Sequence, residues 1–105
     1  MQRNMTIQGN PYEFYAEYPD AGDKEPVFLP GGIKVVTFTL VPAGGESSKI
    51  QATTDPESMV LSGTATWVDH PDGAVTEAKQ GKVEAVSAIR VVVVSGSATL
   101  SLRAS

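Results

Sequence analysis

Apolar and polar side chains alternate near the start of the chain, over residues 12–18. In order, the residues are Tyr12, Glu13, Phe14, Tyr15, Ala16, Glu17 and Tyr18. Because successive side chains of a strand point to opposite faces, this pattern predicts a strand with one buried face and one polar face.

A second apolar run covers residues 33–41, which read IKVVTFTLV. β-Branched and aromatic residues dominate the run, and such residues suit a pleated surface. Pro42 and Gly44 end it with turn-forming residues. We expect residues 49–54, which follow the turn, to pair with it as an antiparallel strand.

The end of the chain has the strongest strand pattern. Residues 86–94 include four consecutive valines, and residues 98–103 alternate apolar with polar side chains. Because the turn formers Ser-Gly-Ser separate the two runs, we predict a closing β-hairpin. Valines at both alternating sets of positions predict a central strand that is covered on both faces. We favour a core position for these valines, because valine is usually buried. The alternative is an apolar outward face bearing Val91 and Val93, which would suit contact with another protein.

Shorter strands are predicted at residues 27–29, 59–61, 64–69 and 74–79. Residues 77–86 are the only stretch with a helical composition, and no apolar pattern with helical spacing extends over three turns. Turn residues recur about every ten positions, as in all-β domains. We therefore predict an all-β fold, either an antiparallel, jelly-roll-like β-sandwich or a small barrel of about eight short strands.

The chain has 105 residues, of which 41% are hydrophobic, and this size and composition indicate one globular domain. Residues 1–10 are polar and are expected to form a flexible N-terminal arm, which leaves a single β domain over residues 11–105. A domain this small buries a modest core. Association with further copies would add stability, so we expect a homo-oligomer.

Charge and composition argue against several classes of partner and chemistry. The formal net charge is -4, whereas nucleic-acid binding requires clustered Lys and Arg, so we expect no nucleic-acid partner. The absence of cysteine excludes disulfides, thiol catalysis and thiolate metal sites. We find neither the apolar core of a signal peptide in residues 1–10 nor the roughly 20 apolar residues of a membrane span. We therefore expect no membrane partner and synthesis in the cytoplasm.

Candidate catalytic residues are few. The only histidine, His70, lies in the turn sequence Asp-His-Pro-Asp-Gly, and a single histidine does not supply a multi-histidine zinc site. Glycoside hydrolysis needs two carboxyl groups roughly 5–10 Å apart, whereas Glu13 and Glu17 would lie about 13 Å apart along one strand. No Gly-x-Ser-x-Gly nucleophile motif occurs. We predict no catalytic residues, no metal site, no cofactor and no enzyme activity.

Four aromatic residues are the candidate partner-binding residues: Tyr12, Tyr15, Tyr18 and Trp67. Aromatic side chains dominate the energetics of cores and of protein interfaces, so we favour a core or interface position for the tryptophan. The same residues could stack on sugar rings. A carbohydrate-binding or host-adhesion module is therefore the alternative function.

Several short motifs lie between residues 50 and 104. They are Gln51–Pro56 (QATTDP), Ser62–Asp69 (SGTATWVD), Pro71–Val75 (PDGAV), Ala88–Arg90 (AIR) and Val94–Leu100 (VSGSATL). Together these motifs resemble small virion proteins of tailed bacteriophages, in the size range of capsid decoration, or cement, proteins.

The resemblance implies a structural role without active site or cofactor. The expected partner is the major capsid protein or another virion protein, and the expected form is a dimer or trimer on the capsid surface. The chain would be made in the host cytoplasm and carried in the virion, and a tail or neck location is a neighbouring possibility. Exposed edge strands and an extended terminus would serve such binding by strand addition.

Overall fold

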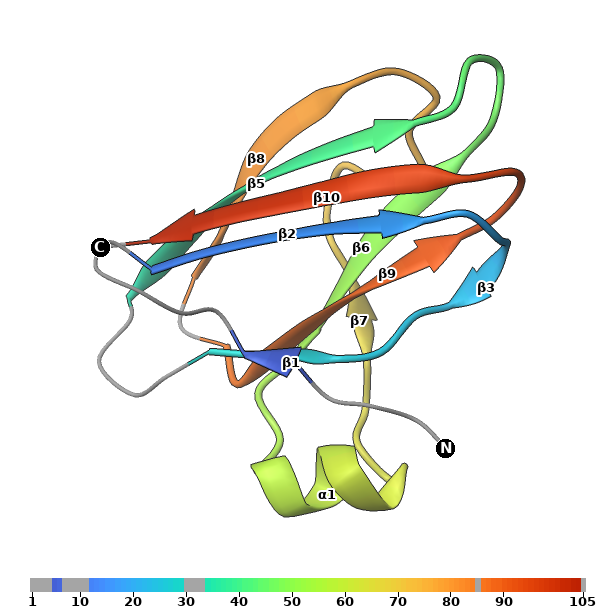
Figure 1. Ribbon diagram of the computed structural model, residues 1–105. Coiled ribbons are helices and arrows are strands. Elements are labelled where there is room, and N and C mark those ends of the chain that lie inside the picture. Colours follow the sequence, from blue (N-terminus) through green and yellow to red (C-terminus); the bar gives the residue numbers. More distant parts are fainter. Residues whose placement is uncertain (1–4, 7–11, 30–33, 85, 105) are drawn as a thin grey trace.

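The computed structural model describes residues 5–6, 12–29, 34–84 and 86–104, which form two β-sheets packed face to face (Figure 1). Sheet A has the order β1 (Met5–Thr6), β4 (Val27–Phe28), β9 (Ala88–Val93), β6 (Ser48–Thr53) and β7 (Val68–Asp69), and β3 (Gly22–Asp23) also pairs with β9. Sheet B has the order β2 (Tyr12–Tyr18), β10 (Ala98–Ala104), β5 (Val35–Pro42) and β8 (Lys79–Glu84). The predicted all-β fold is confirmed as a sandwich rather than a barrel.

All neighbouring strands are antiparallel except β1 and β4, which are parallel. Most of the predicted N-terminal arm, residues 1–4 and 7–10, lies outside the described residues. The two described residues of that segment, Met5 and Thr6, pair with Val27 and Phe28.

The core lies between the sheets and takes every second side chain from each long strand. Its most enclosed members are Val27, Val36, Phe38, Leu40, Ile50, Ile89, Val91, Val93, Leu100 and Leu102. Val91 and Val93 are 0% and 1% exposed, which confirms the core position favoured for them and rules out the alternative of an outward face for a partner. Arg90 and Val92 alternate with them and lie on the outer face of sheet A, half-buried. The prediction that this strand is central in its sheet is confirmed.

The predicted closing hairpin is wrong, because β9 belongs to sheet A and β10 to sheet B. Their connection is an arch between the sheets, with Gly96 at φ 68. The backbone N–H groups of Val94 and Ser95 donate to the Ser47 carbonyl at 2.9 and 3.1 Å, and Ala43 donates to the Ser97 carbonyl at 2.8 Å. The arch is thus hydrogen-bonded to the connection between β5 and β6, which also passes from one sheet to the other.

The pairing predicted between residues 33–41 and 49–54 is also wrong, for the same reason. β5 pairs with β10 and β8 in sheet B, whereas β6 pairs with β9 and β7 in sheet A. The chain crosses the sandwich at residues 43–47 instead of turning within one sheet.

Residues 59–61, predicted as a strand, belong to the helix α1 (Glu57–Ser62). Pro56 precedes the helix with its φ already at -58, and Gly63 ends it in the left-handed conformation, with φ 80. Val60 is buried against Phe28 and Ala88, so the helix covers one end of the outer face of sheet A (Figure 1). An apolar run of three residues does not distinguish strand from helix, and here the flanking Pro and Gly decide the outcome.

Two further strand predictions change in extent. Of residues 64–69, only Val68–Asp69 pair, as β7. Of residues 74–79, only Val75, in an isolated bridge with Ser48, and Lys79, the first residue of β8, take part in strand pairing. Residues 77–86, which have a helical composition, contain β8 instead, and tertiary pairing with β5 outweighs their weak local preference.

Candidate functional site

No described element covers the outer face of sheet B (Figure 1). None of the side chains on this face is buried. This surface, called here the open face of sheet B, consists of Glu13, Tyr15, Glu17, Val35, Thr37, Thr39, Val41, Gln80, Lys82, Glu84, Thr99, Ser101 and Arg103. The same alternation that sends apolar side chains into the core places these side chains outside.

Small side chains line the middle of the open face, and larger ones lie on its outer strands. One row across the sheet runs from Tyr15 through Ser101 and Thr39 to Gln80. Tyr15 is 63% exposed, and the Gln80 amide donates to the Thr39 hydroxyl at 3.3 Å. The result is a shallow, open depression of about 1110 Å³ over the centre of the sheet.

Charges of both signs surround this depression. Glu13 and Arg103 lie side by side on β2 and β10, with carboxylate and guanidinium 3.7 Å apart. Both side chains are about two-thirds exposed, so the pair contributes little to stability. Glu17, on β2, makes no ion pair among the described residues. Glu13 and Glu17 thus lie on the β2 side of the open face, and Lys82 and Glu84 lie on the opposite side, on β8.

The two long edge strands of sheet B differ. β2 pairs only with β10 in the described part of the chain, over seven consecutive residue pairs without a bulge. β8 pairs with β5, but the turn that follows β7 packs against it. The His70 Nε2 atom lies 2.9 Å from the Lys82 carbonyl oxygen, which is thus already hydrogen-bonded.

His70 connects the two sheets. Its backbone N–H donates to the Ile50 carbonyl of sheet A at 2.8 Å, and its ring meets Phe38 of sheet B edge-on at 5.0 Å. The Asp72 backbone N–H donates to Nδ1 at 3.1 Å, so Nε2 carries the proton and donates to Lys82. The histidine therefore has a structural role that its turn sequence alone does not reveal.

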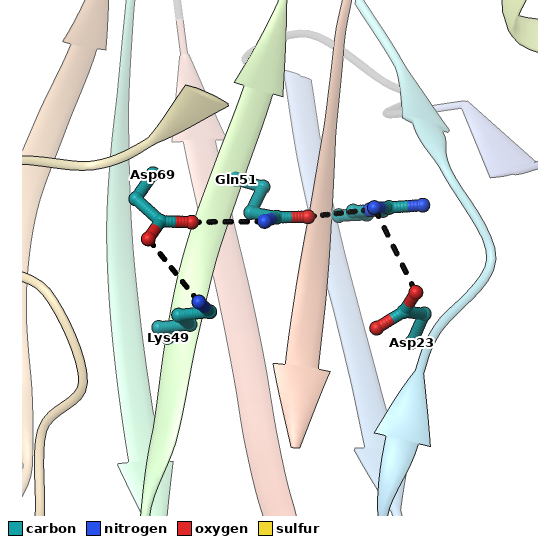
Figure 2. Close-up of polar contacts among 5 residues, drawn as sticks. Asp23, Lys49, Gln51 and Asp69 are labelled. Atoms are coloured by element: carbon teal, nitrogen blue, oxygen red, sulfur yellow. Dashed lines mark hydrogen bonds and ion pairs between the residues drawn. The ribbon is translucent and has the colours of Figure 1, made fainter. Parts of the chain in front are cut away.

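The outer face of sheet A carries a line of polar contacts (Figure 2). The Gln51 amide donates to Asp69 at 2.8 Å, and its carbonyl oxygen accepts from Arg90 Nε at 2.8 Å. Lys49 Nζ lies 3.1 Å from Asp69, and the Arg90 guanidinium lies 3.7 Å from Asp23. The hydrogen bond from Gln51, followed by that from Lys49, lowers the pKa of Asp69 below its usual value. These side chains thus satisfy one another's polar groups across the outer face of sheet A.

The four aromatic candidates do not form one platform. Tyr12 and Tyr18 pack towards the core from β2, while Tyr15 points outward from the same strand. Trp67 lies by the other sheet, packed against the cluster under α1, and the Arg90 guanidinium covers its ring at 4.5 Å. Their role in binding a partner stays a prediction, and Tyr15 is the one with a large exposed surface.

Tyr18 combines burial with an unsatisfied hydroxyl. The side chain is 7% exposed, and its oxygen has no hydrogen-bond partner among the described residues. Burial, and secondarily the negative charge of Glu25, raises the pKa of Tyr18 to about 12. The hydroxyl therefore stays neutral over the physiological pH range.

Sequence analysis missed two features, His70 as a connection between sheets and the polar line on sheet A. Arg90 is the signal for the second, because it interrupts the apolar run AIRVVVV at an outward position. Residues 12–29, 34–84 and 86–104 contain no cluster of three or more residues able to hold a metal ion. Within the described parts of the chain, no helix is both long and apolar enough to span a bilayer.

No protein-family model matches the chain, and no curated protein matches it significantly. Among solved structures, the SPBc2 prophage-derived protein YomS is similar, with a TM-score of 0.54 and 12% sequence identity over 89% of this chain and 95% of that chain. A protein of Bacillus endospore appendages, which are described as a novel family of disulfide-linked pili, has a TM-score of 0.44 and 10% sequence identity. This match covers 89% of this chain and 84% of that chain. At these identities the likeness to YomS establishes a shared fold.

Proposed function

We propose that this chain is a structural virion protein, which binds and stabilises the surface of a phage capsid as a decoration, or cement, protein. The observation that carries the proposal is the open face of sheet B, a rigid strand-built surface that no described element covers. The motif resemblance to phage virion proteins supports the same role, and a prophage-derived protein shares the fold. The proposed location is the virion, and the proposed partner is the major capsid protein or another virion protein.

The open face has the make-up of a binding surface rather than that of a catalytic site. Its centre is low and polar, because it is formed by the short side chains of Thr37, Thr39 and Ser101. Tyr15 lies beside this centre, and 63% of its surface is exposed. Tyrosine is enriched at protein interfaces because it offers a large apolar ring together with one polar group. We propose that the chain is no enzyme and acts by contact alone, as a dimer or trimer.

The test is co-sedimentation of the purified chain with capsids assembled without it. We expect binding in a fixed ratio to the capsid protein and a rise in the temperature at which the shells disrupt. Thr39→Arg, which fills the centre of the depression, should reduce binding by about tenfold or more, since interface centres tolerate bulk poorly. Thr76→Arg, an equal change at an exposed loop position off the open face, is the matched control.

Two outcomes contradict different parts of the proposal. Absence of binding to shells would contradict the decoration role, and binding to isolated tails or necks instead would move the protein to that part of the virion. Equal binding by Thr39→Arg and Thr76→Arg would contradict the role of the open face while leaving the decoration role intact.

A carbohydrate-binding or adhesion module is the second candidate, and the exposed ring of Tyr15 is the observation that favours it. Stacking of a sugar on this ring would depend on Tyr15 alone among the four aromatic candidates, because the others are packed or covered. A glycan panel measured with the wild type and with Tyr15→Ala separates the two functions. Saturable binding that Tyr15→Ala removes would favour the module.

A further inference from the structure

The sheet edges differ in how well they are protected against pairing with another chain. Native proteins protect edges by keeping the strands short, by adding charge, or by covering them. In the described chain, β1 and β7 contain two residues each. β8 carries Lys79 and Lys82, and His70 is hydrogen-bonded to its backbone. Three of the four edges thus carry a protective feature.

β2, the fourth edge, is neither short nor covered by a described segment, and its only charged residues are Glu13 and Glu17. It is seven residues long, contains no proline, and pairs with β10 in unbroken register. Its inward side chains are all uncharged, and its charged residues, Glu13 and Glu17, lie on the open face. No backbone hydrogen bond joins residues 12–18 to any described segment other than β10. In the described part of the chain, no segment pairs with the backbone groups on the outer side of β2.

We propose that β2 accepts an extended segment of a partner virion protein as an additional antiparallel or parallel strand, and that this segment carries Lys or Arg opposite Glu13 and Glu17. The inference rests on the proposed function, because it names the docking edge and the chemistry of the partner. Strand addition supplies affinity through main-chain hydrogen bonds, and the side chains supply specificity.

The charges of β2 argue against a second copy of this chain as the occupant. Antiparallel pairing of two β2 strands about Tyr15 would place Glu13 of each copy opposite Glu17 of the other, and like charges directly opposite destabilise a sheet. A shift by two residues separates the glutamates but leaves only residues 12–16 or 14–18 paired. Pairing of β2 with β8 of a second copy would meet the turn containing His70.

A basic partner strand fits this edge better. Because Glu13 and Glu17 are four residues apart, their partners on an added strand would also be four residues apart and on the same face. Arg103 already lies 3.7 Å from Glu13, so Glu17 is the stronger determinant of the two. Small or apolar side chains would alternate with the basic ones and extend the core beside Phe14 and Ala16.

The test uses two short capped peptides that alternate valine with lysine or valine with glutamate. We expect the lysine peptide to shift the amide resonances of residues 12–18 and to slow their hydrogen exchange. Its affinity should exceed that of the glutamate peptide by about tenfold. N-methylation of alternate peptide bonds should abolish binding, because it removes the main-chain donors.

Glu17→Lys tests the charge, and Glu84→Lys is its matched control on β8, with the same change in net charge. We expect Glu17→Lys to reverse the preference between the peptides and Glu84→Lys to preserve it, with both variants as stable as the wild type. Perturbed amides on β8 instead of β2, no peptide binding, or an unchanged preference in Glu17→Lys would overturn the proposal.

The peptide assay and the capsid assay test the docking edge and the decoration role independently. If shells bind the wild type and Glu17→Lys equally, the β2 inference is wrong and the decoration role stands. If the lysine peptide docks on β2 but no shell binds the protein, the edge is a docking site and the decoration role is wrong.

Discussion

At the scale of single residues, the polar atoms buried in the sandwich show where stability is lost. Tyr18 has a hydroxyl that is enclosed without a partner among the described residues, as has Ser48. A buried polar group without a hydrogen bond costs about 1–3 kcal/mol. Such a cost is a substantial fraction of the total stability of a small domain.

Replacing Tyr18 by Phe should therefore leave the free energy of unfolding at pH 7 unchanged or raise it by up to about 2 kcal/mol. The pKa of Tyr18 is raised to about 12 in the folded chain, against an ordinary value near 10. The wild type keeps the full contribution of the neutral phenol below pH 10 and loses it progressively as the pH rises towards 12.

Urea titrations of the wild type and Tyr18→Phe between pH 8 and 12 measure this effect. The stability of the variant relative to the wild type should increase between pH 10 and 12, because the variant has no phenol at position 18 to ionise on unfolding. A constant difference across that range, or a loss of stability in Tyr18→Phe at pH 7, would contradict the burial described for this hydroxyl.

Alternation in the sequence correctly predicted which side chains of β2 face the core, because a period of two is a local property of a strand. The role of His70 was beyond sequence analysis, since its contacts with Lys82 and Phe38 join segments that are far apart in the chain. The separation of Trp67 from the tyrosines depends on sheet order, which no local pattern encodes.

At the scale of elements, β8 is held against the sandwich by close packing around Gly81. A Cβ atom at this position would lie 2.8 Å from Phe38 Cζ and 3.2 Å from an Asp72 carboxylate oxygen. Phe38 is 2% exposed and its ring contacts His70, so it has little room to move. The glycine allows the edge of sheet B to approach the turn that contains His70.

Gly81→Ala should lower the free energy of unfolding by about 1–3 kcal/mol, the usual cost of overpacking a core. Gly44→Ala is the matched control, because its Cβ would meet nothing within 4 Å and its φ is not positive. Thermal unfolding of both variants checks the prediction. Equal melting temperatures for the two would show that the packing around Gly81 is looser than described.

Strand existence was easier to predict than strand pairing. Residues 98–103 have the alternating pattern of a strand in either sheet, and the Ser-Gly-Ser connection fits a hairpin as well as an arch. The outcome depends on bonds from Val94 and Ser95 to Ser47, a residue about fifty positions away. Sequence patterns therefore predicted the all-β class, while the assignment of strands to sheets required the tertiary structure.

At the scale of the whole molecule, the two sheets have different surfaces. Sheet A is partly covered by α1, and its remaining polar side chains pair with one another. Sheet B exposes one face and one seven-residue edge. This asymmetry is what the proposal of a decoration protein depends on, because it gives the molecule one side for a partner and one side for solvent.

Hydrogen exchange of the shell-bound protein tests this account most directly. The protein is bound to capsids assembled without it, and the amide exchange rates of β2 and β8 are compared with those of the free protein. The account predicts at least about tenfold slower exchange along Tyr12–Tyr18 and unchanged exchange along Lys79–Glu84. Binding that leaves the exchange of β2 unchanged would contradict the docking of a partner at β2, and a failure to bind at all would contradict the decoration role.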